Sequence, residues 1–252
     1  MHRRSLLTVL AASLPIAVAG CTGSGDDGAD AGDQDGSNGG SDALGGDEPG
    51  EPELTTLESI TAVADRYDHD ARTFTGSGSE LTADFELRDS ITVFITEHAG
   101  DEHFGPILSN ESGLRSFRPI NEYGPYAGTA AVGVQADTYH LDVVASGDWS
   151  IEIAQPASPD EAIHQLPVEA SGEGRDVVGP VELTGTATVT GTHDDEGAFG
   201  VEILDEAGRG ERGQVERVFD EVGAFDGQES VEMNAVSWIH VDADGPWTIE
   251  IE

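Results

Sequence analysis

Three residues near the C-terminus have side chains that could recognise a ligand. Trp238, His240 and Asp242 occupy alternate positions, and side chains at alternate positions of a β-strand lie on the same face. An indole ring on an outer face can stack on a sugar or contact a partner protein. The sequence therefore predicts a candidate ligand or partner face at these residues, with packing of Trp238 against another part of the chain as the alternative.

Histidines and carboxylates also come close together, and both are common metal ligands. One set is His240, Asp242 and Glu250, and a second is His98 and His103 with Glu97, Asp101 and Glu102. Carboxylates are frequent throughout the chain, so neither set stands out and we predict no metal site. Acidic loops such as Asp194-Asp195-Glu196 keep calcium open as a candidate cofactor, because Ca²⁺ prefers oxygen ligands.

Motifs that carry enzymatic chemistry are missing from the sequence. It has no Gly-x-Ser-x-Gly, no phosphate-binding Gly-x-x-x-x-Gly-Lys and no His-Glu-x-x-His. All 11 basic residues are arginines, which excludes a Schiff-base lysine, and the 50 acidic residues single out no catalytic pair. We therefore expect no enzymatic activity and name no catalytic residue. The alternative is a secreted carboxylate-dependent hydrolase acting on an envelope or extracellular polymer.

The charge of the chain limits its partners. A formal net charge of −39 argues against nucleic acid, because phosphate binding needs clustered basic side chains. Apolar residues make up 37% of the chain in regular patterns, which argues against general disorder. This lysine-free, acidic composition resembles proteins of extreme halophiles, in which molar salt screens the repulsion between carboxylates.

The N-terminus has the features of an export signal. Arg3 and Arg4 precede a largely apolar run from Leu6 to Ala19, which is too short to span a bilayer. This start resembles a twin-arginine signal peptide, and Val18-Ala19-Gly20-Cys21 resembles a lipobox of halophilic archaeal lipoproteins. The resemblance implies a signal peptide over 1–20, lipid attachment at Cys21, and an anchor in the outer face of the cytoplasmic membrane. Cys21 is the only cysteine, so no intrachain disulfide can form.

Two further segments separate the N-terminus from the main body. Residues 21–53 are rich in Gly, Ser and Asp without apolar periodicity, which predicts a disordered acidic linker. Residues 54–71 place Leu57, Ile60 and Tyr67 at helical spacing. This spacing predicts a short helix, or alternatively an extended lead-in to the first strand.

The rest of the chain contains two similar stretches. Each ends in a Gly-containing turn followed by a strand that opens with tryptophan, Trp149 in one and Trp247 in the other. We predict two tandem repeats, 72–156 and 157–252. Short alternating strands and Gly-rich turns predict an all-β fold of antiparallel, jelly-roll-like β-sandwiches. In each repeat we expect the last two strands to pair as a hairpin, with Trp149 and Trp247 in the core.

The hairpin pattern resembles the small β-sandwich domains appended to secreted bacterial and archaeal proteins. Such domains bind, space or chaperone. The expected function is therefore that of a surface-anchored lipoprotein with a non-catalytic binding, spacer or interaction role in the cell envelope. An envelope glycan or a protein is the expected partner.

Overall fold

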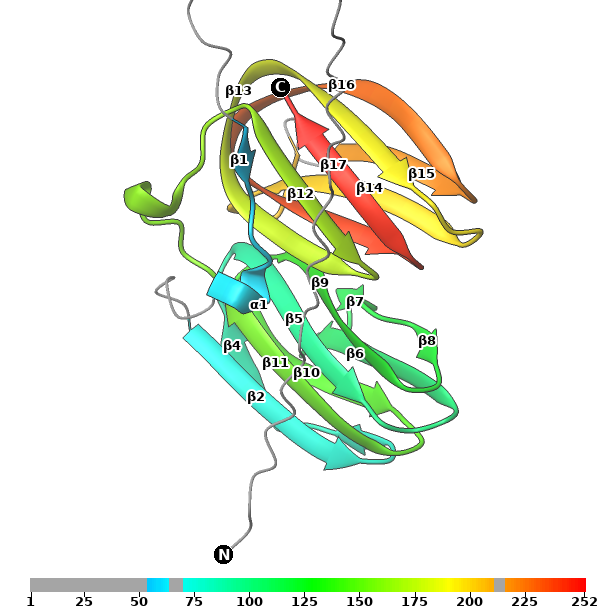
Figure 1. The fold of residues 1–252 in the computed structure, drawn as a ribbon. Coiled ribbons are helices and arrows are strands. Elements are labelled where there is room, and N and C mark those ends of the chain that lie inside the picture. The colour runs from blue at the N-terminus through cyan, green and yellow to red at the C-terminus, as the bar shows by residue number, and fades with distance from the viewer. Residues whose placement is uncertain (1–53, 64–69, 211–215) are drawn as a thin grey trace, which may run out of the picture. The chain divides into compact units, whose positions relative to one another are not determined.

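The computed structural model describes residues 54–63, 70–210 and 216–252, which belong to one compact unit. The predicted all-β class with antiparallel sheets is confirmed (Figure 1). None of the helices in the described ranges is long and apolar enough to cross a membrane. The elements are β1 Thr55–Thr56, α1 Ile60–Val63, β2 Asp70–Ser77, β3 Glu80–Leu81, β4 Phe85–Leu87, β5 Ser90–His98, β6 His103–Asn110, β7 Ser116–Phe117, β8 Glu122–Tyr123, β9 Tyr126–Val134, β10 Asp137–Val144, β11 Asp148–Gln155, the 3₁₀ helix Asp160–Ala162, β12 Val168–Glu173, β13 Asp176–His193, β14 Ala198–Asp205, β15 Glu216–Val222, β16 Phe225–Ala243 and β17 Pro246–Ile251.

The N-terminal half, residues 70–155, consists of two packed sheets. One sheet has the order β2-β11-β5-β9, and the other has the order β3-β10-β6-β7 with β4 on β10 and β8 on β6. Alternate residues of facing strands fill the space between them, including Phe94, Leu141 and Ile151, which are fully buried. Burial of one face and exposure of the other produces the period-two pattern seen in the sequence.

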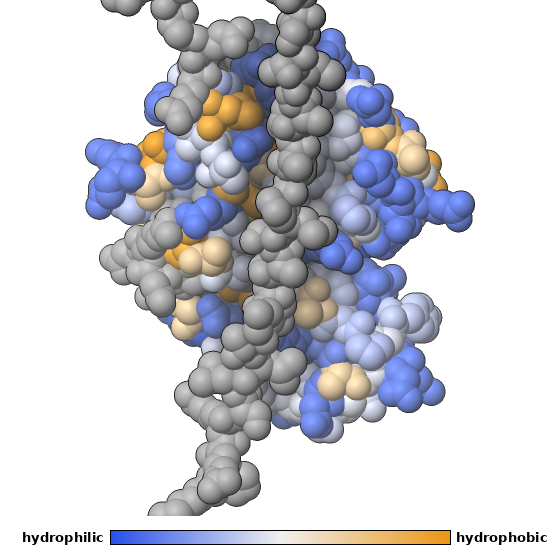
Figure 2. All heavy atoms as spheres, in the orientation of Figure 1, coloured by the Kyte–Doolittle hydropathy of each residue, from blue (hydrophilic) through white to orange (hydrophobic). Residues whose placement is uncertain are grey.

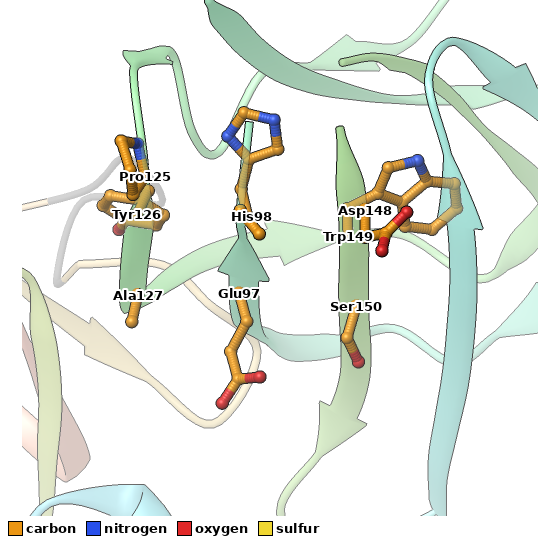
Figure 3. A pocket seen from close by; sticks show the side chains of 9 residues that line it. Glu97, His98, Pro125, Tyr126, Ala127, Asp148, Trp149 and Ser150 are labelled. Atoms are coloured by element: carbon orange, nitrogen blue, oxygen red, sulfur yellow. The ribbon is translucent and has the colours of Figure 1, made fainter. Parts of the chain in front are cut away.

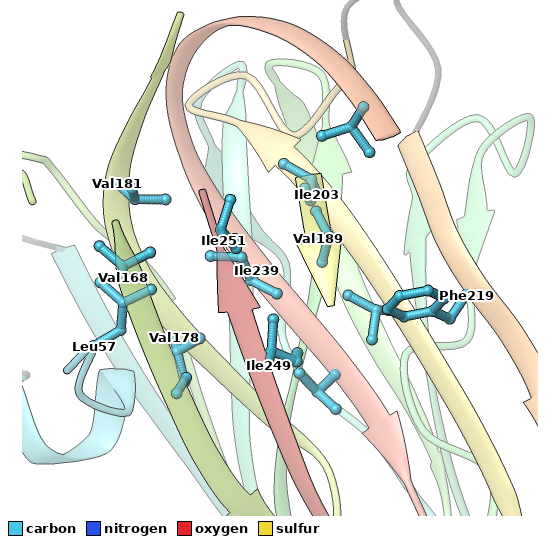
Figure 4. Packing of buried hydrophobic residues seen from close by; sticks show 14 of the residues in the cluster. Leu57, Val168, Val178, Val181, Val189, Ile203, Phe219, Ile239, Ile249 and Ile251 are labelled. Atoms are coloured by element: carbon cyan, nitrogen blue, oxygen red, sulfur yellow. The ribbon is translucent and has the colours of Figure 1, made fainter. Parts of the chain in front are cut away.

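The C-terminal half, residues 168–251, supplies six strands of a seven-stranded sheet, and β1 adds the seventh at one edge, in the order β1-β12-β17-β13-β16-β14-β15. Its two longest strands, β13 and β16, pair along most of their length with a register shift between Val178 and Val181. Residues from both ends of the sheet, such as Val168 and Phe219, belong to one buried cluster (Figure 4). The sheet therefore curves around a core of its own.

The prediction that the last two strands of each stretch pair as a hairpin is wrong. β10 and β11 lie in different sheets of the N-terminal half, and β16 and β17 both pair with β13 and not with each other. The burial prediction holds, since Trp149 is 4% and Trp247 is 2% exposed. Alternation reports which face of a strand is buried and not which strand lies beside it, so two strands that face each other across a core show the same pattern as a hairpin.

A third apolar cluster joins the two halves to the short helix. It contains Ile60 and Val63 of α1, Ile91, Val93 and Ala131 of the N-terminal half, and Val177, Leu204 and Trp238 of the C-terminal half. Asp176 adds polar bonds to this contact, because its Oδ1 accepts from Ser59 Oγ at 2.7 Å and from Thr129 Oγ1 at 3.0 Å. The helix is short, and Ser59 rather than Thr55 precedes it, with Oγ accepting from the Thr61 amide.

Candidate functional site

A shallow hollow of about 590 Å³ lies at one end of β5, β9 and β11, and we call it the Trp149 hollow (Figure 3). Its lining residues are Glu97, His98, Ala99, Pro125, Tyr126, Ala127, Asp148, Trp149 and Ser150. Two rows of cross-strand neighbours build it. Trp149, His98 and Tyr126 form one row, and Ser150, Glu97 and Ala127 form the next. Adjacent rows face opposite sides of a sheet, so the aromatic row turns toward the core and the polar row toward solvent.

The indole of Trp149 is held in place from two sides. Its Nε1 donates to the carbonyl oxygen of Gly78 at 2.9 Å. A Cβ atom on Gly76 would lie 2.3 Å from the indole Cζ2, so only glycine fits beneath the ring. These contacts give the hollow a rigid aromatic wall.

His98 is the residue of this hollow whose environment the sequence did not indicate. It is 4% exposed, its Nδ1 lies 2.9 Å from the carbonyl oxygen of Gly124, and its ring stacks on Phe104 at 4.6 Å. Its Nε2 is buried and has no hydrogen-bond partner in the described part of the chain. The imidazole of His98 therefore belongs to the buried part of the protein.

The C-terminal half repeats this arrangement. His193 is 1% exposed, its Nδ1 lies 3.1 Å from the Gly223 carbonyl oxygen, and its ring stacks on Phe199 at 5.2 Å. Trp247 Nε1 likewise donates to the Gly174 carbonyl at 2.9 Å. The histidine precedes the phenylalanine by the same number of positions in both stretches, and this equal spacing is the signal in the sequence from which the two stacked pairs could have been found. The division into two tandem repeats, 72–156 and 157–252, stays a prediction.

A second hollow of about 530 Å³ shares Pro125, Tyr126 and Ala127 with the first and reaches Arg175 of the C-terminal half. The Arg175 side chain is 18% exposed, with Nη1 3.0 Å from Glu122 Oε1 and its Nε bonded to Asp242. Burial raises the pKa of Glu122. The positive charge of Arg175 opposes this shift, and the negative charge of Asp242 adds to it. Burial also raises the pKa of Tyr126 to about 12. One guanidinium thus holds carboxylates of both halves.

The three residues of the predicted face, Trp238, His240 and Asp242, do not share one open surface, and ligand or partner binding by His240 and Asp242 stays a prediction. Trp238 is 0% exposed and packs in the cluster between the halves, which is the alternative that the sequence left open. The His240 side chain is 11% exposed with Nδ1 3.6 Å from Glu202 Oε2, and Asp242 bonds Arg175. The outward face of β16 is covered here because the N-terminal half and α1 pack on it, and strand alternation cannot report such a contact.

The remaining candidates are the histidines and carboxylates that could bind a metal ion. Across residues 54–63, 70–210 and 216–252, no group of three or more His, Cys, Asp or Glu side chains is arranged to hold a metal ion. His103 instead lies with Nε2 2.9 Å from Asn121 Oδ1. Calcium binding stays a prediction. Cys21, Arg3, Arg4 and the linker lie outside the described residues.

No protein-family model and no curated protein matches the chain. Several solved structures are similar at low level. A deletion mutant of Bacillus subtilis oxalate decarboxylase has a TM-score of 0.27 and 9% identity over 77% of this chain and 71% of that chain. The formate complex of Lactobacillus farciminis oxalate decarboxylase has a TM-score of 0.25 and 8% identity over 77% of this chain and 79% of that chain. A cupin 2 conserved barrel domain protein from Leptotrichia buccalis has a TM-score of 0.23 and 14% identity over 73% of this chain and 82% of that chain.

These similarities contradict the expectation that the protein is not an enzyme, because two of the three structures are enzymes. We withdraw that expectation. Scores and identities this low assign no activity, substrate or cofactor to this chain.

Proposed function

We propose that the protein is an exported lipoprotein held at the outer face of the cytoplasmic membrane by Cys21, and that its β-sheet body binds a glycan of the cell envelope. The N-terminal features of the sequence support the address. The Trp149 hollow supports the binding role. The acidic composition supports a working environment of molar salt.

The single observation that carries the binding role is the pairing of carboxylates with a largely apolar hollow. Glu97, Asp148 and Ser150 line the hollow together with Pro125 and the residues of the aromatic row (Figure 3). Carboxylates accept hydrogen bonds from hydroxyl groups, and apolar surfaces pack against the C–H faces of sugars. No arginine lines this hollow, so it suits a neutral, hydroxyl-rich ligand rather than an anion.

The test is a thermal melt of the full-length protein at constant molar salt with soluble envelope oligosaccharides. A ligand at a hundred times its Kd stabilises by about 2.7 kcal/mol, which raises the Tm by a few degrees. Glu97→Gln with Asp148→Asn should abolish the shift. A double variant with the same charge change on exposed strands and turns, Glu111→Gln with Glu229→Gln, should keep it. A shift that survives in the first double variant would overturn the assignment of the hollow.

A second candidate is a hydrolase that uses the adjacent hollow. A general acid is favoured by a pKa above that of a free carboxyl group. Burial shifts the pKa of Glu122 in this direction against the opposing charge of Arg175, and Glu122 shares its hollow with Tyr126 and Asp244. The location between the two halves agrees with the groove that a carboxylate-dependent hydrolase would need.

This candidate is tested by turnover of the same oligosaccharides. Glu122→Gln should lower kcat by about 100-fold or more. Asp242→Asn, which removes the other carboxylate on Arg175, should keep most of the activity and controls for disruption of the ion pairs. Binding without turnover in the wild-type protein would exclude this candidate and leave the binding role.

A further inference from the structure

A different hollow, of about 520 Å³, lies toward the other end of β11 and has two arginines among its lining residues. We call it the arginine pocket. Its lining residues are Arg72, Glu86, Leu87, Arg88, Asp89, Ala136, Asp137, Thr138, Ile153 and Gln155. Leu87 and Ile153 are buried and form an apolar floor. A pocket of this volume admits a small organic molecule.

Within residues 54–63, 70–210 and 216–252, neither Arg72 nor Arg88 forms an ion pair. Arg118 also forms none there, whereas Arg115, Arg175, Arg209 and Arg217 each do. The pocket therefore brings together two of the three arginines of these ranges that have no carboxylate partner there. A guanidinium fork matches the two oxygens of a carboxylate.

Both side chains are held in position by the protein. The guanidinium of Arg72 lies 5.9 Å from the centroid of the Phe85 ring, a cation–π contact that orients it. Arg88 Nη2 donates to the Gln155 carbonyl oxygen at 3.1 Å. The Gln155 side chain is buried and bonds the backbone of Arg88 twice, through Oε1 from the amide at 2.9 Å and through Nε2 to the carbonyl at 3.0 Å.

Two of the three carboxylates of the lining are already occupied. Asp89 Oδ1 lies 2.7 Å from Arg209 Nη2. Asp137 Oδ2 accepts from Asn110 at 2.9 Å and lies 3.4 Å from Arg115 Nη1, and the Asn110 bond is the main reason why the pKa of Asp137 is lowered. Each of these two carboxylates is neutralised by an arginine from outside the lining, so Glu86 is the carboxylate of the lining that remains beside Arg72 and Arg88.

We propose that the arginine pocket binds a small organic carboxylate, with Arg72 and Arg88 holding the carboxylate group and the apolar floor holding its carbon skeleton. This site is separate from the Trp149 hollow and does not depend on the glycan-binding role. Apolar contact with Leu87 and Ile153 favours an organic acid over an inorganic anion.

The test is isothermal titration calorimetry of the full-length protein with malonate at constant molar NaCl. We expect saturable binding with one site per chain. Arg72→Gln and Arg88→Gln should each weaken the Kd about tenfold or more, since each removes a charge-assisted bond. Arg118→Gln is the matched control, because Arg118 is exposed, contacts only Asn121 outside the pocket, and loses the same charge.

Three results would overturn the proposal. Equal binding of malonate to the wild type, Arg72→Gln and Arg88→Gln would show that the pocket is not the site. Equal binding of the neutral malonamide, or tighter binding of inorganic phosphate, would contradict carboxylate recognition. Absence of malonate binding at tens of millimolar would remove the site. Glu97→Gln with Asp148→Asn should leave malonate binding unchanged, which separates this proposal from the glycan site.

Discussion

Replacement of Trp238 by alanine tests whether the two halves share one interface. Trp238 is fully buried among Ile91 and Val93 of the N-terminal half, Val63 of α1 and Leu204. A buried indole removes about 150–250 Å² from water, which at about 25 cal/mol per Å² corresponds to about 4–6 kcal/mol. Measured Trp→Ala changes in cores cost about 3–5 kcal/mol, so we expect a loss in that range.

The assay is equilibrium unfolding by urea at constant molar salt, followed by far-UV circular dichroism. Leu81→Ala is the control, because Leu81 is 64% exposed and its truncation should change stability by less than about 0.5 kcal/mol. Because the cluster contains residues of both halves, Trp238→Ala should also separate their unfolding into two transitions. A loss below about 1 kcal/mol would refute the packing of Trp238 between the halves.

Three further changes have defined outcomes. The imidazole of His240, whose Nδ1 lies 3.6 Å from Glu202 Oε2, is the main cause that lowers the pKa of Glu202. The stabilisation from this contact is present above a pH of about 4.5 and is lost as the pH falls through the lowered pKa. Glu202→Gln should therefore flatten the dependence of the urea midpoint on pH in this range. Gly76→Ala places a Cβ 2.3 Å from the Trp149 indole and should cost about 1–3 kcal/mol in the same assay. Arg175→Gln removes the guanidinium from Glu122 and Asp242, whose side chains are 29% and 46% exposed, and should lower the free energy of unfolding by about 1 kcal/mol, since solvent screens part of the interaction.

The sequence predicted the class of the fold because the burial pattern is local. Tyr139, Leu141 and Val143 alternate with polar residues, and all three are buried as that alternation requires. Strand neighbours are set by contacts distant in sequence. Pairing of β11 with β2 and β5 therefore could not be derived from the Gly-x-Trp turn that joins it to β10.

The candidate site was only partly predictable for a related reason. Trp149 is distant in sequence from Glu97 and His98, and they meet because β5 and β11 are neighbours. Trp238 had the spacing of an exposed residue, yet the N-terminal half and α1 pack on the surface where it lies. An inference from one strand cannot include the element that packs on its outer face. Likewise, the sequence does not indicate that Arg72 and Arg88 lie close together, because this follows only from the placement of β2 and β4 beside one pocket.

The outer surface agrees with an acidic protein that has few apolar patches. Figure 2 shows mainly hydrophilic side chains on the described part of the visible face, with apolar residues scattered between them. The large exposed apolar residues are few and include Leu114, Tyr123 and Val222. Recognition by the described body therefore rests on hollows with specific chemistry rather than on a broad apolar surface.

The most direct test of the binding role is to locate the ligand on the protein. Amide chemical shifts of the full-length protein would be followed by NMR while the oligosaccharide with the largest effect on the Tm is added at constant molar salt. We predict that the shifts concentrate at residues 97–99, 126–127 and 148–150, which line the Trp149 hollow, and disappear in the Glu97→Gln, Asp148→Asn variant. Shifts confined to other parts of the sheets, or unchanged in that variant, would contradict the account.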